Sequence, residues 1–161
     1  MITATSDYKR AVLKSDISLI CVGTPNNKSG HLDTNTVERV VAEIGMVLKD
    51  KNSSHLIVIR STIPPGTIRK LKNILARSAG DKINNKFDVV MNPEFLREGT
   101  AISDFFHPPY ILIGTNVKNS FETMKKMYSG INCEIIQVMP EIAELIKFIN
   151  NSFHALKITF A

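Results

Sequence analysis

Residues 87–99 read Phe-Asp-Val-Val-Met-Asn-Pro-Glu-Phe-Leu-Arg-Glu-Gly, an apolar run followed directly by a charged loop. Pro93 lacks a backbone N–H and has a fixed φ, so we expect a strand to end just before it and the chain to turn out over the end of a sheet. Glu94 and Glu98 would share one face of a short helical turn, with Arg97 limiting their repulsion. Because ligands bind beyond the carboxyl ends of strands in open α/β sheets, this loop is a predicted site. A solvated helix start with ordinary charges is the alternative.

Strand and helix patterns alternate outward from this loop in both directions. The expected strands are residues 17–22, 56–59, 87–91, 110–113 and 134–138; the expected helices are residues 7–14, 35–48, 67–78, 100–105 and 120–128, followed by a long helix from about Pro140. Thr67 is expected to cap its helix, and residues 79–86 to form a loop. The alternation predicts an α/β fold with a doubly wound, mostly parallel sheet in residues 1–139. Residues 140–161 would begin the long helix.

The long C-terminal helix carries a polar stripe. At helical spacing its polar residues Glu144, Lys147, Asn151 and His154 fall on one narrow face, and the other faces are apolar. A helix that is apolar around most of its girth is expected to be buried, so the stripe should face a polar site or an interface. A solvated stripe on a surface helix is the alternative.

The loop at residues 92–99 is similar, residue for residue, to the signature of the nucleotide-sugar 6-dehydrogenases, the family of UDP-glucose and GDP-mannose dehydrogenases. Three further stretches match that family in the expected order: Cys-Val-Gly-Thr-Pro at residues 21–25, Ser-Thr-Ile-Pro-Pro-Gly-Thr at residues 61–67, and residues 143–157. The resemblance spans essentially the whole chain but only the middle of such an enzyme. It implies a partial Rossmann-like NAD-binding domain in residues 1–139 that lacks its first strands, followed by the start of a central dimerisation helix.

The family reaction oxidises the primary alcohol at carbon six of a nucleotide sugar to a carboxylate with two NAD⁺, through a thiohemiacetal and a thioester on a cysteine. By resemblance, Glu94 would be the general acid or base, with a pKa that its surroundings can raise. Lys147 would stabilise the alkoxide and oxyanion, and Asn151 would donate to the same oxygen. Thr62 would position water and touch the cofactor.

The remaining roles also follow from the resemblance. Thr24 would contact NAD and Glu98 would lie near the nicotinamide, whereas the backbone of Phe95, Leu96 and Arg97 would line the sugar site. His154 resembles the GDP-mannose branch more than the UDP-glucose branch. Read without the family, a threonine at the end of a strand more often serves as a cap or turn residue, and a lone histidine is more often structural.

Two parts of the family pattern are not found. The eight glycines never approach the Gly-x-Gly-x-x-Gly spacing of the dinucleotide fingerprint, and neither Cys21 nor Cys133 lies in a motif that could replace the nucleophilic cysteine. We therefore expect the isolated chain to bind NAD weakly or not at all and to be inactive. We also expect an exposed edge strand and exposed apolar surface on the last helix.

Composition narrows the setting of the protein. The 161 residues are 43% hydrophobic with a net charge of +5, which suits one globular domain. The lysines are scattered without interleaved aromatic residues, so nucleic acid is not expected as a partner. Cys21 and Cys133 are expected inside strands as small core residues, which indicates a reducing, cytoplasmic setting. No secretory segment, membrane span or metal site is predicted.

The predicted function is NAD-dependent oxidation of GDP-mannose, or of UDP-glucose, as part of a larger enzyme that forms a homo-oligomer through the central helix. The alternative from another class is a non-catalytic truncated fragment that acts as a binding or assembly module. A β-hydroxyacid dehydrogenase is a more distant enzymatic alternative, against which the loop at residues 92–99 argues.

Overall fold

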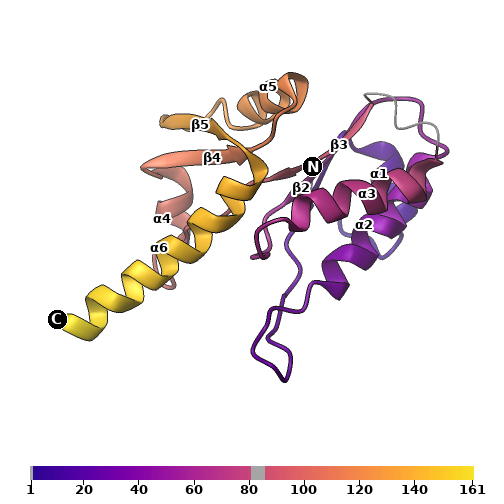
Figure 1. The fold of residues 1–161 in the computed structure, drawn as a ribbon. Coiled ribbons are helices and arrows are strands. Elements are labelled where there is room, and N and C mark those ends of the chain that lie inside the picture. The colour runs from indigo at the N-terminus through magenta and orange to yellow at the C-terminus, as the bar shows by residue number, and fades with distance from the viewer. Residues whose placement is uncertain (1, 81–85) are drawn as a thin grey trace.

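The computed structural model of the chain describes residues 2–80 and 86–161. Most of the loop expected at residues 79–86 lies outside that part. The helices are α1 (Tyr8–Lys14), α2 (Asn35–Leu48), α3 (Thr67–Ala79), α4 (Ala101–Phe106), α5 (Lys118–Met127) and α6 (Pro140–Phe160), and the strands are β1 (Ile17–Ile20), β2 (His55–Ile59), β3 (Phe87–Met91), β4 (Tyr110–Gly114) and β5 (Glu134–Val138) (Figure 1). The α/β class and every expected element are confirmed, with ends that differ by a residue or two.

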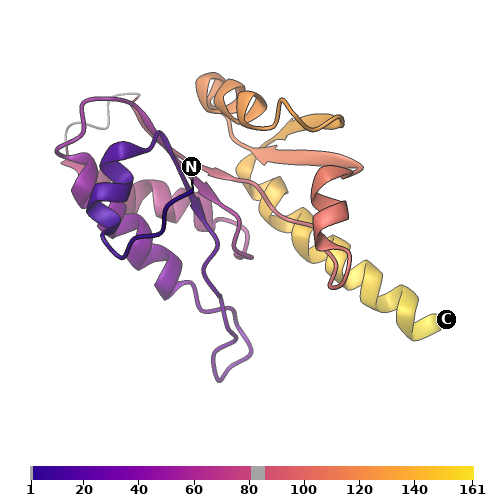
Figure 2. The same cartoon turned by 180° about the vertical axis from the view of Figure 1, so that it is seen from behind.

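The sheet runs in the order β1-β2-β3-β4-β5 and is mostly parallel, as predicted. Strands β1, β2 and β3 pair in parallel, and so do β4 and β5. Between these two groups, β3 and β4 pair antiparallel through the single pair Met91 and Gly114. Figures 1 and 2 show the result as two lobes, with α1, α2 and α3 around β1–β3, and α4, α5 and α6 around β4 and β5.

Apolar side chains cover both faces of the sheet, as a doubly wound arrangement requires. On one face, Val41 of α2 and Leu71 of α3 pack with Ile57 and Ile59 of β2. On the other, Val58, Val90 and Ile113 pack with Met124 of α5 and with Tyr128. Strand β1 is an edge of the described sheet, where Leu19 is 50% exposed. Strands β2 and β3 therefore lie in the interior of the sheet, with buried side chains on both faces.

Helix α6 is exposed along most of its length, so the prediction of a buried helix is wrong for this chain. Its buried residues are Pro140, Ala143, Glu144 and Lys147, all in the first two turns. Beyond them the helix leaves the sheet, and Figure 1 shows it extending away from both lobes. The exposed large apolar residues of α6 are Ile142, Leu145, Ile149, Phe153, Leu156, Ile158 and Phe160. The expectation of exposed apolar surface on this helix is confirmed.

The expectation that the cysteines are core residues inside strands is also wrong. Cys21 is exposed and Cys133 is half-buried, and both are free thiols. Cys21 follows the last residue of β1 and Cys133 precedes the first residue of β5. Cys21 lies outside the packed layers, whereas Cys133 packs against the edge of the apolar cluster on the α5 face. Among the described helices, none is both long and apolar enough to cross a membrane.

Candidate active site

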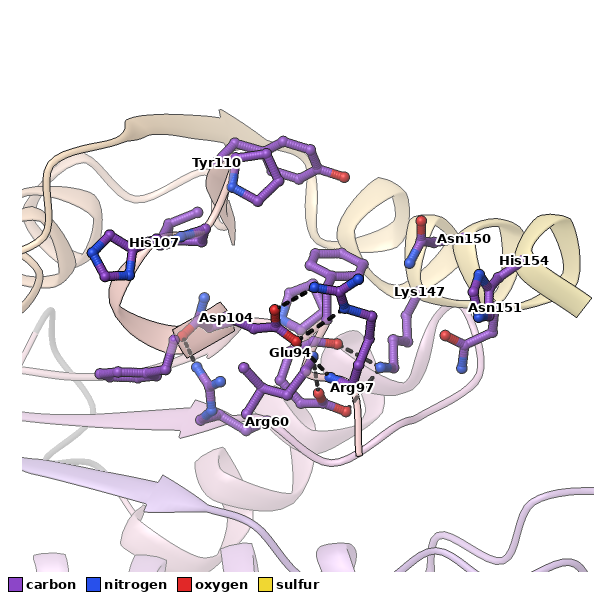
Figure 3. Close-up of a pocket in the computed structure, with 18 of the residues that line it drawn as sticks. Arg60, Glu94, Arg97, Asp104, His107, Tyr110, Lys147, Asn150, Asn151 and His154 are labelled. Carbon is purple, nitrogen blue, oxygen red and sulfur yellow. Dashed lines mark hydrogen bonds and ion pairs between the residues drawn. The ribbon is translucent and has the colours of Figure 1, made fainter. Parts of the chain in front are cut away.

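A pocket of about 770 Å³ opens beside the carboxyl ends of β2 and β3 and along α6 (Figure 3). The loop that follows β3 forms one wall, and the exposed turns of α6 form another. The predicted site residues that line it are Glu94, Phe95, Leu96, Arg97, Glu98, Lys147, Asn151 and His154. The structure therefore brings the loop at residues 92–99 and three of the four residues of the polar stripe of α6 to one cavity.

Lys147 and Glu94 form the central contact of the pocket. The Lys147 Nζ donates to the backbone carbonyl of Glu94 at 2.5 Å and to its Oε1 at 2.8 Å. The ammonium also lies 5.6 Å from the centre of the Phe95 ring. Lys147 is only 6% exposed, so water hardly competes for these contacts. The lysine is held by three groups of one loop, and it fixes the direction of the Glu94 carboxylate.

The electrostatics of Glu94 differ from our expectation. Burial acts to raise the pKa of Glu94, but hydrogen bonds from Lys147 and from the Leu96 N–H, together with the charges of Lys147 and Arg60, outweigh it. The pKa of Glu94 is therefore lowered from its ordinary value, and the prediction of a raised pKa is wrong. Glu94 is held as a carboxylate, the form that accepts a proton.

Arg97 does not lie between two glutamates on a helical turn, because residues 92–97 are an irregular loop and α4 begins only at Ala101. Its guanidinium pairs instead with Asp104 of α4, with Nη2 2.7 Å from Oδ1, and its backbone N–H donates to Oδ2 at 3.0 Å. These hydrogen bonds hold the pKa of Asp104 well below its usual range. Asp104, which the sequence analysis missed, anchors this loop to the following helix.

The sequence analysis also missed a polar cluster of Arg60, Asn92 and Tyr128 beneath the loop. The Tyr128 hydroxyl donates to Asn92 Oδ1 at 2.5 Å, and Arg60 Nη1 donates to the same oxygen at 2.7 Å. Asn92 Nδ2 donates to the carbonyl of Leu112 at 2.9 Å. Asn92 is the first residue of the charged loop, and Arg60 directly precedes the motif at residues 61–67. Their positions beside the two motifs are the sequence signal that could have identified them. The cluster ties the ends of β2, β3 and α5 together.

Asn151 and His154 project from the exposed part of α6 at the edge of the pocket (Figure 3). Both residues are exposed, and the hydrogen bonds described for this chain leave their side chains unpartnered. Glu144, the fourth residue of the predicted polar stripe, does not join them. It is fully buried, and its carboxylate binds the start of α3. Three residues of the stripe therefore lie at the pocket, and the fourth lies at the N-terminus of α3.

Thr24 and Thr62 are brought together, although not in the pocket. The Thr24 hydroxyl donates to the carbonyl of Thr62 at 2.8 Å, and the neighbouring Ser61 hydroxyl donates to the carbonyl of Val22 at 2.7 Å. The loops that follow β1 and β2 are thus joined at the carboxyl edge of the sheet. Neither threonine lines the 770 Å³ cavity.

The described residues do not fit a complete dinucleotide. A pyrophosphate is ordinarily held by free amides at a helix N-terminus, but at α3 the amides of Gly66 and Ile68 are occupied by Glu144. At the start of α2, the Glu38 carboxylate accepts from the Thr34 hydroxyl at 2.6 Å and from the Lys70 ammonium at 2.7 Å. A metal site is a separate question. In the described part of the chain, no three histidine, cysteine or acidic side chains lie close enough together to bind a metal ion.

Comparison with known proteins identifies the family. The model for the NAD binding domain of the UDP-glucose/GDP-mannose dehydrogenase family matches residues 1–132. GDP-mannose 6-dehydrogenase of Pseudomonas aeruginosa is 42% identical over 161 residues, which cover 99% of this chain and 37% of that protein. A UDP-glucose 6-dehydrogenase of Haloferax volcanii is 32% identical, over 98% of this chain and 38% of that protein. The chain therefore spans little more than a third of the length of these relatives.

Solved structures agree in fold. A ternary complex of the Pseudomonas aeruginosa GDP-mannose dehydrogenase superposes with a TM-score of 0.92 at 43% identity, covering 97% of this chain and 36% of that one. A UDP-glucose dehydrogenase from Pyrobaculum islandicum superposes with a TM-score of 0.90 at 37% identity and the same coverage. From its motifs, its fold and these matches, the chain belongs to the UDP-glucose/GDP-mannose dehydrogenase family.

Proposed function

We propose that this chain forms the sugar-oxidising wall of an NAD-dependent nucleotide-sugar 6-dehydrogenase. The observation that carries the proposal is the contact between Lys147 and Glu94, which places a buried ammonium and a carboxylate of lowered pKa on one cavity. An alcohol is oxidised only if its hydroxyl proton is removed, and this pair supplies both an acceptor for that proton and a charge to stabilise the resulting alkoxide.

In this proposal Glu94 accepts the proton of the substrate hydroxyl at its carboxylate. The Lys147 ammonium, already 2.8 Å from Glu94 Oε1, stabilises the negative charge that forms on the substrate oxygen. Asn151 lies one helical turn after Lys147 and lines the same cavity, so its amide donates to that oxygen. The backbone of Phe95, Leu96 and Arg97 lines the sugar.

GDP-mannose is the favoured substrate, with UDP-glucose as the alternative. Relatives named GDP-mannose 6-dehydrogenase are up to 44% identical to this chain, and the UDP-glucose enzyme of Haloferax volcanii is 32% identical. His154 also lines the pocket, and a histidine at this position resembles the GDP-mannose branch of the family more than the UDP-glucose branch. The β-hydroxyacid dehydrogenase alternative is set aside because the chain matches the nucleotide-sugar family.

The cofactor of the proposed reaction is NAD, and Thr24, Thr62 and Glu98 are its proposed contacts in this chain. The occupied N-terminus of α3 supports weak or absent binding of NAD by the chain alone. The isolated chain is therefore proposed to be inactive. The two free cysteines support a reducing, cytoplasmic location.

Calorimetric titration of the 161-residue chain tests the proposal. We expect saturable heat with GDP-mannose, less with UDP-glucose, and none with NAD⁺ up to millimolar concentration. Asn151→Ala should weaken sugar binding without loss of fold, because the Asn151 side chain is exposed; Asn52→Ala, on an exposed loop away from the pocket, is the matched control. Binding of NAD⁺ at micromolar concentration would contradict the proposal that the cofactor site of this chain is incomplete. Absence of heat with both sugars would remove the substrate assignment.

The second candidate is a binding or assembly module, and the exposed apolar residues of α6 favour it. A contiguous apolar helix face is stabilised when a partner covers it. We propose that this face joins copies of the parent protein into a homo-oligomer. Light scattering on wild-type protein and on Ile149→Glu tests this: the wild type should self-associate and the variant should not. A monomeric wild type would contradict the proposal.

A further inference from the structure

Glu144 caps a helix to which it does not belong. Its Oε2 accepts from the Gly66 N–H at 2.6 Å and its Oε1 accepts from the Ile68 N–H at 2.6 Å. Helix α3 has no side-chain cap of its own, because its N-cap is Gly66 with φ of 89° and Thr67, the expected cap, is its first helical residue. The two amides would otherwise be unsatisfied at this buried helix end. The carboxylate therefore holds α6 on the N-terminus of α3.

Lys147 lies three residues later on α6 and holds a different loop. Glu144 binds the loop that follows β2, which carries Thr62, and Lys147 binds the loop that follows β3 at Glu94. In the described part of the sheet, strand pairing joins the two lobes only at Met91 and Gly114. Apolar packing and the hydrogen bonds around Asn92 add further links between them. Glu144 and Lys147, which are one turn apart on α6, thus hold the loop after β2 and the loop after β3 at fixed positions relative to the helix.

The close fit of α6 against the sheet leaves it little freedom to shift. A Cβ added at Gly114 would lie 2.6 Å from the Ala143 Cβ and 3.1 Å from the Pro140 Cα. Because an α-helix is stiff over one turn, the place where Glu144 docks determines where the Lys147 ammonium arrives. A shift of about 1 Å along the helix axis would separate hydrogen-bonded groups that meet at 2.8 Å.

We propose that Glu144 is a positioning residue: by docking on the amides of Gly66 and Ile68, it sets α6 in the one place at which Lys147 reaches Glu94. Glu144 itself does not touch the pocket. The catalytic meaning of this coupling rests on the proposed function, but the coupling is a property of the chain and is measured without substrate or cofactor.

The docking uses both oxygens of the Glu144 carboxyl group, one for each amide. Burial raises the pKa of Glu144, and the hydrogen bonds from Ile68 and Gly66 act against that rise. A carboxylate offers an acceptor to both amides, whereas a glutamine offers one acceptor and turns an N–H toward the second amide. Glu144→Gln therefore changes the contact by one atom while keeping the size of the side chain. Glu141→Gln is the matched control, since it removes the same charge from the first turn of the same helix, where the described part of the structure shows no hydrogen bond to the Glu141 side chain.

The readout is the titration of the Glu94 carboxyl carbon by NMR. Lys147 lowers the pKa of Glu94, so loss of that contact moves the titration upward, and Lys147→Met gives the full size of this effect. We expect Glu144→Gln to move the Glu94 titration in the same direction and Glu141→Gln to leave it in place. A folded Glu144→Gln protein with a wild-type Glu94 titration would show that Glu144 only caps α3, and would overturn the proposal.

A reciprocal measurement covers the case in which Glu144→Gln does not fold. In Lys147→Met, the amides of Gly66 and Ile68 should exchange with solvent several-fold faster than in the wild type, because coupling between two contacts acts in both directions. Exchange unchanged from the wild type would also overturn the proposal. If the coupling is found but no nucleotide sugar binds, the proposed function fails and this inference stands.

Discussion

The Lys147 ammonium lies 2.8 Å from the Glu94 carboxylate although 53 residues separate them in the chain. The contact joins the two motifs that the sequence places furthest from the N-terminus. The contact also lowers the pKa of Glu94, so its effect on stability can be measured as a function of pH without any ligand.

Replacing Lys147 by Ala should lower the free energy of unfolding by about 1–3 kcal/mol at neutral pH, because hydrogen bonds to the buried side of the Glu94 loop are lost. The pKa of Glu94 is lowered in the folded chain, so its contribution to stability is present above the ordinary value of 4.5 and is lost as pH falls. Urea unfolding across this range should show a weaker acid dependence in the variant. Lys157→Ala, exposed on the same helix, is the control.

Tyr128→Phe should destabilise the chain by about 1 kcal/mol, because the hydroxyl donates to Asn92 at 2.5 Å and accepts from Arg60 at 2.8 Å. Urea denaturation measures the loss. Tyr110→Phe removes a hydroxyl for which the described structure shows no hydrogen bond, and should cost much less. Equal effects of the two substitutions would contradict the role of Tyr128 in holding Asn92.

His55 should make stability depend on pH. It is buried beside Lys51, with Nδ1 3.0 Å from the Lys51 ammonium and Nε2 2.8 Å from the Ser18 hydroxyl. Burial first, and then the Lys51 charge, lowers the pKa of His55 from 6.5 to about 4. The unfolded chain therefore binds the proton first, and stability that is complete above pH 6.5 is lost as pH falls toward 4.

The size of this loss should be roughly 3 kcal/mol, from the difference between the two pKa values. His55→Gln should lack this part of the pH dependence, and the exposed His31→Gln should keep it. Chemical denaturation at a series of pH values between the two pKa values separates these outcomes. The same slope in both variants would show that another group carries the dependence.

Gly114→Ala should destabilise the junction of the lobes by about 1–3 kcal/mol, because the new Cβ would meet Ala143 Cβ at 2.6 Å and Met91 Cβ at 3.2 Å. At Gly130 a Cβ would meet nothing within 4 Å, so Gly130→Ala should be close to neutral. Thermal unfolding compares the two. A Gly114→Ala protein as stable as Gly130→Ala would mean that α6 can move away from β4 at little cost.

Local signals predicted the elements well where the chain itself marks their ends. Strands β3 and β5 run over the residues expected, since an apolar run stops at Asn92-Pro93 in one case and before Pro140 in the other. The cysteines were misplaced because strand ends depend on pairing with a neighbour, and β1 stops pairing at Ile20. The exposure of α6 could not be read from its own pattern, because burial depends on what covers a helix.

The sequence by itself determined the alternation of strands and helices, the two motif loops, and the placement of Glu144, Lys147, Asn151 and His154 on one side of α6. Only the tertiary structure decided that Glu144 binds α3 while Lys147 binds Glu94, and that Arg97 pairs with Asp104. Periodicity specifies the face of a helix on which a side chain lies, since that depends on local geometry. The partner opposite that face depends on packing between elements far apart in the chain, and no local pattern records it.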